Sequence, residues 1–293
     1  MNLIDAIVQG LIQGLTEFLP VSSSGHLSVF QYFTGLSSES STLFVVLLHF
    51  GTLFAVLAAF YKTIWEMVVE LFVLLKELFT GRFTTKNPPP ARRMIYLLLL
   101  ALLPLFVVLL FKDVIDRVMG DNDIIVEGVC FLITSLLLFT ADRTVVGRRD
   151  ASTMTAPNAL TVGAAQAIAT LPGISRSGAT IGTGLLCGLE RSYAVAFSFI
   201  LGVPAVAGAG LLEFLDLEGA ALAVDPVVAV AGVLTAAVSG FFAIKLVRML
   251  VNSNRLSIFA WYTLVLGILT ITAGVVELAT GGALRNLVVA AIR

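Results

Sequence analysis

Six apolar runs, each long enough to cross a membrane as a helix, constrain this chain more than any other feature. A helix of about 20 predominantly apolar residues spans the hydrocarbon core of a bilayer. Such runs lie at 43–61, 94–111, 124–141, 193–215, 226–244 and 257–276. The chain is 58% hydrophobic and only 13% charged, which excludes an ordinary soluble domain. The sequence therefore predicts an all-α polytopic membrane protein that forms a single membrane domain over residues 1–293.

Two further apolar segments, at 3–33 and 157–190, are interrupted by turn-forming residues. The first contains Pro-Val-Ser-Ser-Ser-Gly at 20–25, and the second contains Pro-Gly-Ile-Ser-Arg-Ser-Gly at 172–178. Proline and glycine end helices, so each segment is predicted to fold as helix, break and helix. Lipid cannot satisfy the backbone groups of a break, which must therefore lie inside the protein or against water. We expect two re-entrant hairpins whose breaks line one interior site.

Basic residues mark the loops that face the cytoplasm. They gather at 76–93, 143–149 and 245–255, whereas the loops at 112–123 and 216–225 are acidic or mixed and are expected outside. This topology lets the first hairpin enter from outside and the second from the cytoplasm. The net charge of −1 gives no reason to expect a nucleic-acid partner.

An internal repeat agrees with this topology. A shift of 153 places sets Gln13 on Gln166, Ser22 on Ser175, Ser24 on Ser177 and Gly25 on Gly178. Repeats at 1–150 and 151–293 each hold one hairpin and three predicted spans. An odd number of crossings turns the second unit upside down relative to the first. The sequence thus predicts an inverted-topology internal repeat.

A polar stripe follows the first broken helix. Its members recur every four residues and share one helical face; they are Asp5, Gln9, Gln13 and Glu17. For Asp5 and Gln9, structural contact between helices explains the pattern as well as function does. Glu17 is the stronger functional candidate because it lies one turn before the break.

The first break supplies hydroxyls and an imidazole at a predicted helix start. Ser22, Ser23 and Ser24 can contact a phosphate bound by unpaired N–H groups, although helix capping alone also explains serines at this place. His26 lies on the same helical face and can act as a base or a nucleophile near neutral pH. The other histidine, His49, is predicted to be a hydrogen-bonded packing residue.

The second break places a guanidinium among hydroxyls at another helix start. Arg176 lies between Ser175 and Ser177, and Thr180 follows one turn later. A guanidinium binds phosphate oxygens bidentately and stays protonated. The alternative is a structural arginine paired with Glu17 or with a backbone carbonyl.

At these breaks the chain resembles the undecaprenyl-diphosphate phosphatase family, also called bacitracin resistance proteins. The family's first signature is Glu or Gln four residues before Glu, followed by Pro-Val-Ser-Ser-(Ser/Thr)-Gly-His, and it is similar to Gln13, Glu17 and Pro20–His26. Its second signature, Pro-Gly-x-Ser-Arg-Ser-Gly-Ala-Thr, is matched in full by Pro172–Thr180. The resemblance includes chain length and the order of spans.

The resemblance implies hydrolysis of undecaprenyl diphosphate to undecaprenyl phosphate and inorganic phosphate. This reaction recycles the lipid carrier for peptidoglycan synthesis and confers bacitracin resistance. The expected catalytic residues are Glu17, Ser23, His26 and Arg176. The expected phosphate-binding residues are Gln13, Ser175 and Thr180, to which the chemistry of the breaks adds Ser22, Ser24 and Ser177.

A divalent cation, Mg or Ca, is also implied, with Glu17 as its candidate protein ligand. Gln13 stands where many family members have a carboxylate, so the cation's ligands stay open between Glu17, the substrate's phosphates and no protein group. The implied location is the bacterial plasma membrane, among membrane lipids, with a site that opens to the outer face. A homo-oligomer is left open.

Three attacking groups are compatible with the sequence. They are Ser23 activated by His26, which we prefer, His26 itself, and a water oriented by Glu17 and His26. Type 2 phosphatidic acid phosphatases share Ser-Gly-His and Ser-Arg fragments but need a second histidine, and none follows His49 here. The alternative function is a lipid flippase or transporter, because inverted repeats with opposed hairpins are typical of alternating access.

Overall fold

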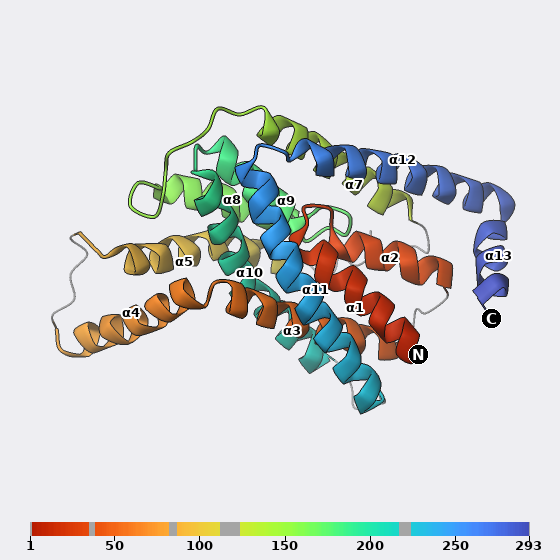
Figure 1. Cartoon of the computed structure of the whole chain (residues 1–293), viewed down its shortest axis with the longest axis horizontal. Coiled ribbons are helices and arrows are strands. Elements are labelled where there is room, and N and C mark those ends of the chain that lie inside the picture. Colours follow the sequence, from red (N-terminus) through yellow and green to blue (C-terminus); the bar gives the residue numbers. More distant parts are fainter. Residues whose placement is uncertain (1, 35–38, 82–86, 112–123, 217–223, 293) are drawn as a thin grey trace.

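The structure, a computed structural model, describes residues 2–34, 39–81, 87–111, 124–216 and 224–292. In these ranges the regular structure is helical, joined by turns and loops, with one isolated β-bridge between Arg149 and Leu189. The helices in these ranges are α1 (Leu3–Phe18), α2 (Ser23–Thr34), α3 (Glu39–Ala59), α4 (Tyr61–Phe79), α5 (Pro90–Leu109), α7 (Ile125–Asp142), α8 (Ala156–Ile168), α9 (Arg176–Leu186), α10 (Arg191–Asp216), α11 (Pro226–Asn252), α12 (Ser257–Thr280) and α13 (Ala283–Ile292) (Figure 1). The loop predicted outside at 112–123, and most of the one at 216–225, lie beyond the described residues.

Five helices are long and apolar enough to cross a membrane, namely α5, α7, α10, α11 and α12. They coincide with the last five of the predicted apolar runs. The first predicted run, 43–61, falls on α3, which is bent by 88° against α4 across Phe60; this pair would count as a sixth span. The prediction of an all-α polytopic membrane protein is confirmed.

Both interrupted segments fold as helix, break and helix. α1 ends at Phe18 and α2 begins at Ser23, while α8 ends at Ile168 and α9 begins at Arg176. The prolines and glycines of the two motifs occupy the breaks, as the sequence predicts. α1 contacts α2, and α8 contacts α9, so each segment doubles back on itself.

Each first helix of a broken segment packs closely on a long helix from the other half of the chain. α1 lies along α11, and α8 lies along α5. A Cβ on Gly10 of α1 would lie 2.6 Å from the carbonyl oxygen of Gly232, and one on Gly163 of α8 would lie 2.1 Å from that of Ala101. Side chains at either glycine would push these helices apart. Figure 1 also shows α7 and α12 side by side along one edge of the molecule.

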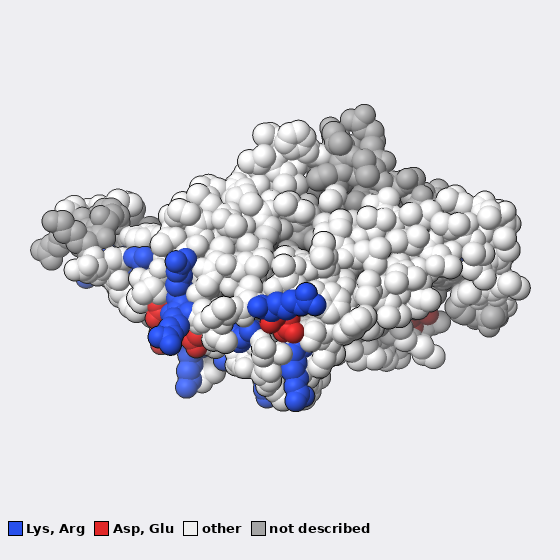
Figure 2. Space-filling model, turned by 90° about the horizontal axis from the view of Figure 1, so that it is seen from above, with Lys and Arg blue, Asp and Glu red and all other residues white. Residues whose placement is uncertain are grey.

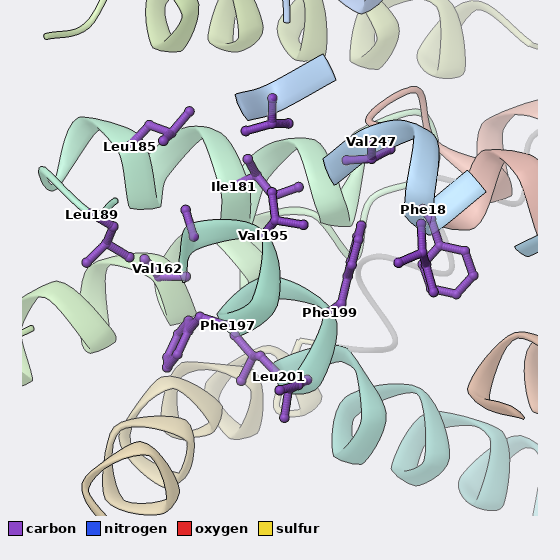
Figure 3. Packing of buried hydrophobic residues seen from close by; sticks show 14 of the residues in the cluster. Phe18, Val162, Ile181, Leu185, Leu189, Val195, Phe197, Phe199, Leu201 and Val247 are labelled. Atoms are coloured by element: carbon purple, nitrogen blue, oxygen red, sulfur yellow. The ribbon is translucent and has the colours of Figure 1, made fainter. Parts of the chain in front are cut away.

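The main hydrophobic core surrounds the first half of α10. Val195, Phe197 and Leu201 of this helix are buried, and Figure 3 shows them among side chains from α8, α9 and α11. Phe18, the last residue of α1, packs edge to face on Phe199 with their ring centroids 5.3 Å apart. Burial of such an aromatic pair anchors the end of α1, and therefore Glu17, against α10.

Charged side chains are unevenly distributed over the face of the molecule in Figure 2. Lys and Arg, with a few acidic residues, gather at the left and centre of this view, and most of the rest of the visible surface is uncharged. Large apolar side chains are exposed elsewhere, including Phe106, Leu136, Phe242 and Leu269. Apolar exposure on this scale is typical of a lipid-facing surface.

Candidate active site

Glu17 on the last turn of α1 receives hydrogen bonds from both broken segments. Its Oε1 accepts from Nη2 of Arg176 at 2.7 Å. Its Oε2 accepts from Oγ of Ser23 at 2.7 Å and from Nε2 of Gln13 at 3.0 Å. Glu17 is only 7% exposed, and a buried carboxylate is stable only when paired and hydrogen-bonded. The structure thus brings together four of the residues that the sequence singled out.

α10 also contacts the Arg176 guanidinium. Its Nη1 donates to the carbonyl oxygen of Ser198 at 3.3 Å, and a Cβ on Gly202 would lie 2.0 Å from the same nitrogen. A larger residue at 202 would therefore move the guanidinium from this position. Thr180 donates to the Arg176 carbonyl at 2.9 Å and is hydrogen-bonded to the Ser198 hydroxyl. A guanidinium has five N–H donors, so these contacts leave capacity for an anionic ligand.

Ser22 joins the two breaks. Its Oγ accepts from the backbone N–H of Gly25 at 3.3 Å and from that of Gly173, in the other break, at 3.1 Å. Its φ of 72° lies in the left-handed region, which serine seldom adopts and which is typical of functional sites. Ser24 is exposed, with its Oγ 3.3 Å from that of Ser22. The expected meeting of the two breaks is therefore present in the structure.

The hydroxyls of the second break already have protein partners. Ser175 caps α9 by accepting from the backbone N–H of Gly178 at 3.0 Å. Ser177 donates to the carbonyl oxygen of Leu19 at 3.2 Å. Ser175, Ser177 and Thr180 are each 1% exposed. In the structure these hydroxyls hold the break in place. Their contact with phosphate stays a prediction.

His26 is oriented by Ser22 and by Tyr262 of α12. Its Nδ1 lies 2.6 Å from the carbonyl oxygen of Ser22, and its Nε2 lies 2.8 Å from the Tyr262 hydroxyl oxygen. A carbonyl oxygen only accepts, so Nδ1 carries the proton, and Nε2 of the neutral ring accepts from Tyr262. The His26 and Tyr262 rings are stacked, with 3° between their planes.

The preferred pairing of Ser23 with His26 is not among the contacts of the described residues. Within the described residues the Ser23 hydroxyl donates to Glu17, and the His26 ring is turned toward the Ser22 carbonyl and α12. Spacing along α2 puts both residues on one face, but the tertiary partners decide where each side chain points. The sequence does not point to Tyr262, because this residue lies 236 residues from His26 in an apolar run. Its phenol group is the only sign of a polar role.

His49 has the expected packing hydrogen bond and a second neighbour as well. Its Nδ1 lies 2.9 Å from the Val45 carbonyl oxygen, while its Nε2 lies 3.9 Å from Oε2 of Glu17. His49 also lines a cleft of about 150 Å³ beside Arg176, together with Gln166 and parts of α5, α8 and α10. The sequence did not assign Gln166 to the site, although the repeat pairs it with Gln13.

The described residues do not fit a divalent cation held by the protein. They contain no group of three His, Cys, Asp or Glu side chains that could bind a metal ion. Both oxygens of Glu17 already accept hydrogen bonds, one of them from Arg176. Mg²⁺ and Ca²⁺ require several oxygen ligands, so waters or the substrate's phosphates would have to supply those that Glu17 does not. Glu17 as a metal ligand stays an untested expectation without support in this geometry.

Comparison with known proteins agrees with the motifs. The family described as bacitracin resistance protein BacA matches residues 6–269. A protein of Methanosphaera stadtmanae named undecaprenyl-diphosphatase is 35% identical over 280 residues, which cover 94% of this chain and 99% of that protein. Proteins of the same name from Alkaliphilus metalliredigens and Korarchaeum cryptofilum are 36% and 37% identical, covering 92% of this chain and 98% of their own lengths. The match includes both breaks and every residue that meets at Glu17, and the chain accordingly belongs to the bacitracin resistance protein BacA family.

Proposed function

We propose that this protein is an undecaprenyl-diphosphatase, which removes the terminal phosphate of undecaprenyl diphosphate and leaves undecaprenyl phosphate. The family and the names of relatives that match along nearly their whole length support this reaction. The structural observation that carries the proposal is the meeting of a hydroxyl and a guanidinium, Ser23 and Arg176, on one buried carboxylate. The reaction recycles the carrier for cell-wall synthesis and confers bacitracin resistance.

Ser23 is the proposed nucleophile, with Glu17 as its base. The Ser23 oxygen bonds to the terminal phosphorus while its proton passes to Oε2 of Glu17, the atom to which the hydroxyl already donates. The bond from that phosphorus to the bridging oxygen breaks, and undecaprenyl phosphate leaves. Arg176 stabilises the negative charge on the phosphoryl oxygens through N–H groups that Glu17 and Ser198 do not occupy.

Water completes the proposed cycle. It attacks the phosphorus of the phosphoserine, and the bond between that phosphorus and the Ser23 oxygen breaks. Glu17 returns its proton to Ser23, and the protons of water stay on the released phosphate. His26 donates a hydrogen bond to the carbonyl oxygen of Ser22 and so maintains the backbone conformation of the break during the attack. No step in this sequence requires a protein-bound metal, and a cation carried by the substrate's own phosphates stays a prediction.

An inverted repeat is the proposed architecture, with six spans when α3 is counted and two re-entrant hairpins. Positions that are 153 residues apart make the same local hydrogen bonds, which supports this proposal. Asn2 and Thr155 both cap their helices in capping boxes. Ser22 and Ser175 both accept from the N–H three residues ahead.

Packing between the two proposed repeats, 1–150 and 151–293, supports the same architecture. α1 packs on α11 while its counterpart α8 packs on α5, as expected when two units exchange equivalent contacts. The counterparts α3 and α10 contact each other, and so do α7 and α12. Such reciprocal contacts are expected of two units related by a two-fold axis, which supports the proposal.

We place the protein in the bacterial plasma membrane with its site open to the outer face. The cleft beside Arg176 is lined by Leu105 near the end of α5 and by Gly210 in the second half of α10. Both helices run on toward loops that the distribution of charge predicts to be outside. The diphosphate would enter there with its polyprenyl tail left among the lipids.

Phosphate release from undecaprenyl diphosphate by the purified protein in detergent tests this function. Turnover without a sealed membrane is expected of a hydrolase, and a requirement for vesicles and a gradient would favour the flippase or transporter instead. Parallel assays with Mg²⁺, Ca²⁺ or a chelator separate the cation prediction from the hydrolase itself. An Arg176→Ala variant with full activity would contradict the proposed site.

A further inference from the structure

The side-chain amide of Gln166, on α8, is buried and makes no hydrogen bond among the described residues. The residue is 2% exposed, and neither Oε1 nor Nε2 has a hydrogen-bond partner among the described residues. Leaving a buried amide unpaired destabilises the folded state, so an unpaired amide in a native protein calls for an explanation. Gln166 and Arg176 line the same cleft. A ligand bound in this cleft would give the amide a hydrogen-bond partner and so explain it.

Comparison with the first half shows why this amide is unpaired. There Nε2 of Gln13 donates to Glu17, four residues further along the helix. The shift of 153 places sets Gln166 on Gln13 and Thr170 on Glu17. Thr170 has no carboxylate, and its hydroxyl donates to the carbonyl oxygen of Ala167 at 2.8 Å. The second half therefore keeps the glutamine but lacks the partner that occupies it in the first.

The cleft is lined by both polar and apolar residues. His49, Gln166, Thr170 and Arg176 supply its polar groups. Its apolar lining residues include Leu105, Ala205, Val206, Ala209 and Gly210. An anionic group bound to Arg176 with an apolar chain attached to it fits this distribution.

We propose that Gln166 binds the substrate by donating its amide N–H to an oxygen of the phosphate that carries the prenyl chain. This inference rests on the proposed function. Ser23 attacks the terminal phosphorus on the Glu17 side of Arg176, so the prenyl-linked phosphate lies on the cleft side, where most lining residues are apolar. Gln166 holds the leaving group in place, and its amide takes no part in proton transfer.

Gln166→Met tests the proposal because methionine nearly matches glutamine in shape and lacks its hydrogen-bonding groups. We expect kcat/KM for undecaprenyl diphosphate to fall about tenfold, in line with the loss of a hydrogen bond to a charged group. The thermal midpoint should stay the same or rise, because an unpaired buried amide has been removed. Inhibition by inorganic pyrophosphate should weaken in parallel, which reports binding without turnover.

Gln9→Met is the matched control. Gln9 is a fully buried glutamine of α1 whose amide oxygen accepts from Gln31 at 3.4 Å. This variant should retain wild-type kcat/KM and melt at a lower temperature, the opposite pattern to Gln166→Met. Gln166→Glu adds a charge that repels the diphosphate and should reduce kcat/KM further.

Each outcome decides the matter. Kinetic constants and pyrophosphate inhibition within about twofold of wild type in Gln166→Met would overturn the proposal, since a lost hydrogen bond to a charged group exceeds that. A Gln166→Met protein that melts lower or does not fold would identify a packing residue and overturn it as well. A wild-type protein that releases no phosphate would refute the proposed function instead, so the two failures are distinguishable.

Discussion

Nη2 of Arg176 lies 2.7 Å from Oε1 of Glu17, although 159 residues separate the two in the chain. This ion pair connects the first residue of α9 with the last turn of α1 and so joins the two broken segments. Each group compensates the charge of the other in a region where water is scarce. Because both charges are largely buried, the consequences of removing one partner depend on what remains of the other.

Arg176→Ala should lower phosphate release at least about a hundredfold, because it removes the proposed donor to the phosphoryl oxygens. It also leaves Glu17 buried without a counter-charge, which should cost about 3–5 kcal/mol of unfolding free energy. Arg176→Lys keeps the charge but loses the planar fork, so it should be stabler than the alanine variant and still impaired. Phosphate release and thermal unfolding measure the two effects. Adding Glu17→Gln to Arg176→Ala should restore stability without activity, and recovery of both would contradict the proposed roles.

Ser23→Ala should reduce turnover about a thousandfold or more, as expected when a nucleophile is lost. Acid quenching of the wild type with substrate labelled at the terminal phosphate should trap a phosphoserine at Ser23, identified by mass spectrometry. Thr272→Val is the control, because it removes an exposed hydroxyl whose contact is the Ile268 carbonyl within α12. Normal turnover by Ser23→Ala would leave water or His26 as the attacking group.

Tyr262→Phe should lower kcat about fivefold, because the hydrogen bond to His26 that it removes contributes about 1 kcal/mol. The variant keeps the ring that stacks on His26, so folding should be unchanged. Nitrogen NMR of labelled histidine should show the proton of the wild-type His26 ring on Nδ1. Tyr61→Phe, at an exposed tyrosine of α4, serves as the control. A ring protonated on Nε2 would contradict the assigned roles of Ser22 and Tyr262.

Gly25→Ala should separate the two breaks. An added Cβ would lie 2.7 Å from Cζ of Phe131 and 2.8 Å from the Cα of Gly173, so the backbone of the second break must move. We expect a loss of about 1–3 kcal/mol in unfolding free energy together with most of the activity. Gly208→Ala is the control, because an added Cβ meets nothing within 4 Å in the described structure and alanine favours a helix. Equal activity in the two variants would show that contact between the breaks is dispensable.

The carboxylate of Asp150, in the loop before α8, provides a test of pH dependence. Hydrogen bonds from Ser152 and Thr153 hold its pKa at about 2, below the usual 3.8. A lowered pKa means that the carboxylate stabilises the fold above pH 3.8 and that this contribution is lost as the pH falls toward 2. A carbon NMR titration of the side chain should give the low midpoint in the wild type. A midpoint near the usual value would show that these bonds do not form in solution.

Local chemistry made much of the fold readable from the sequence. The apolar runs predict the five long apolar helices because a helix in lipid must satisfy its own backbone and present apolar side chains. Proline and glycine located both breaks, since their effect on a helix does not depend on distant residues. The four-residue spacing of Gln13 and Glu17 predicted a shared face, and they are hydrogen-bonded neighbours in the structure.

Tertiary structure alone decided which side chains from different helices meet. Spacing along α2 favoured a pair of Ser23 and His26, but α12 brings Tyr262 to the imidazole, and α1 brings Glu17 to the hydroxyl. Gln166 shares its place in the repeat with Gln13 but is followed by Thr170 in place of a carboxylate, and among the described residues α3, α5 and α10 bring no hydrogen-bond partner to its amide. Helix formation depends on neighbours a few residues away, whereas the partner of a buried polar group depends on which distant helices pack beside it.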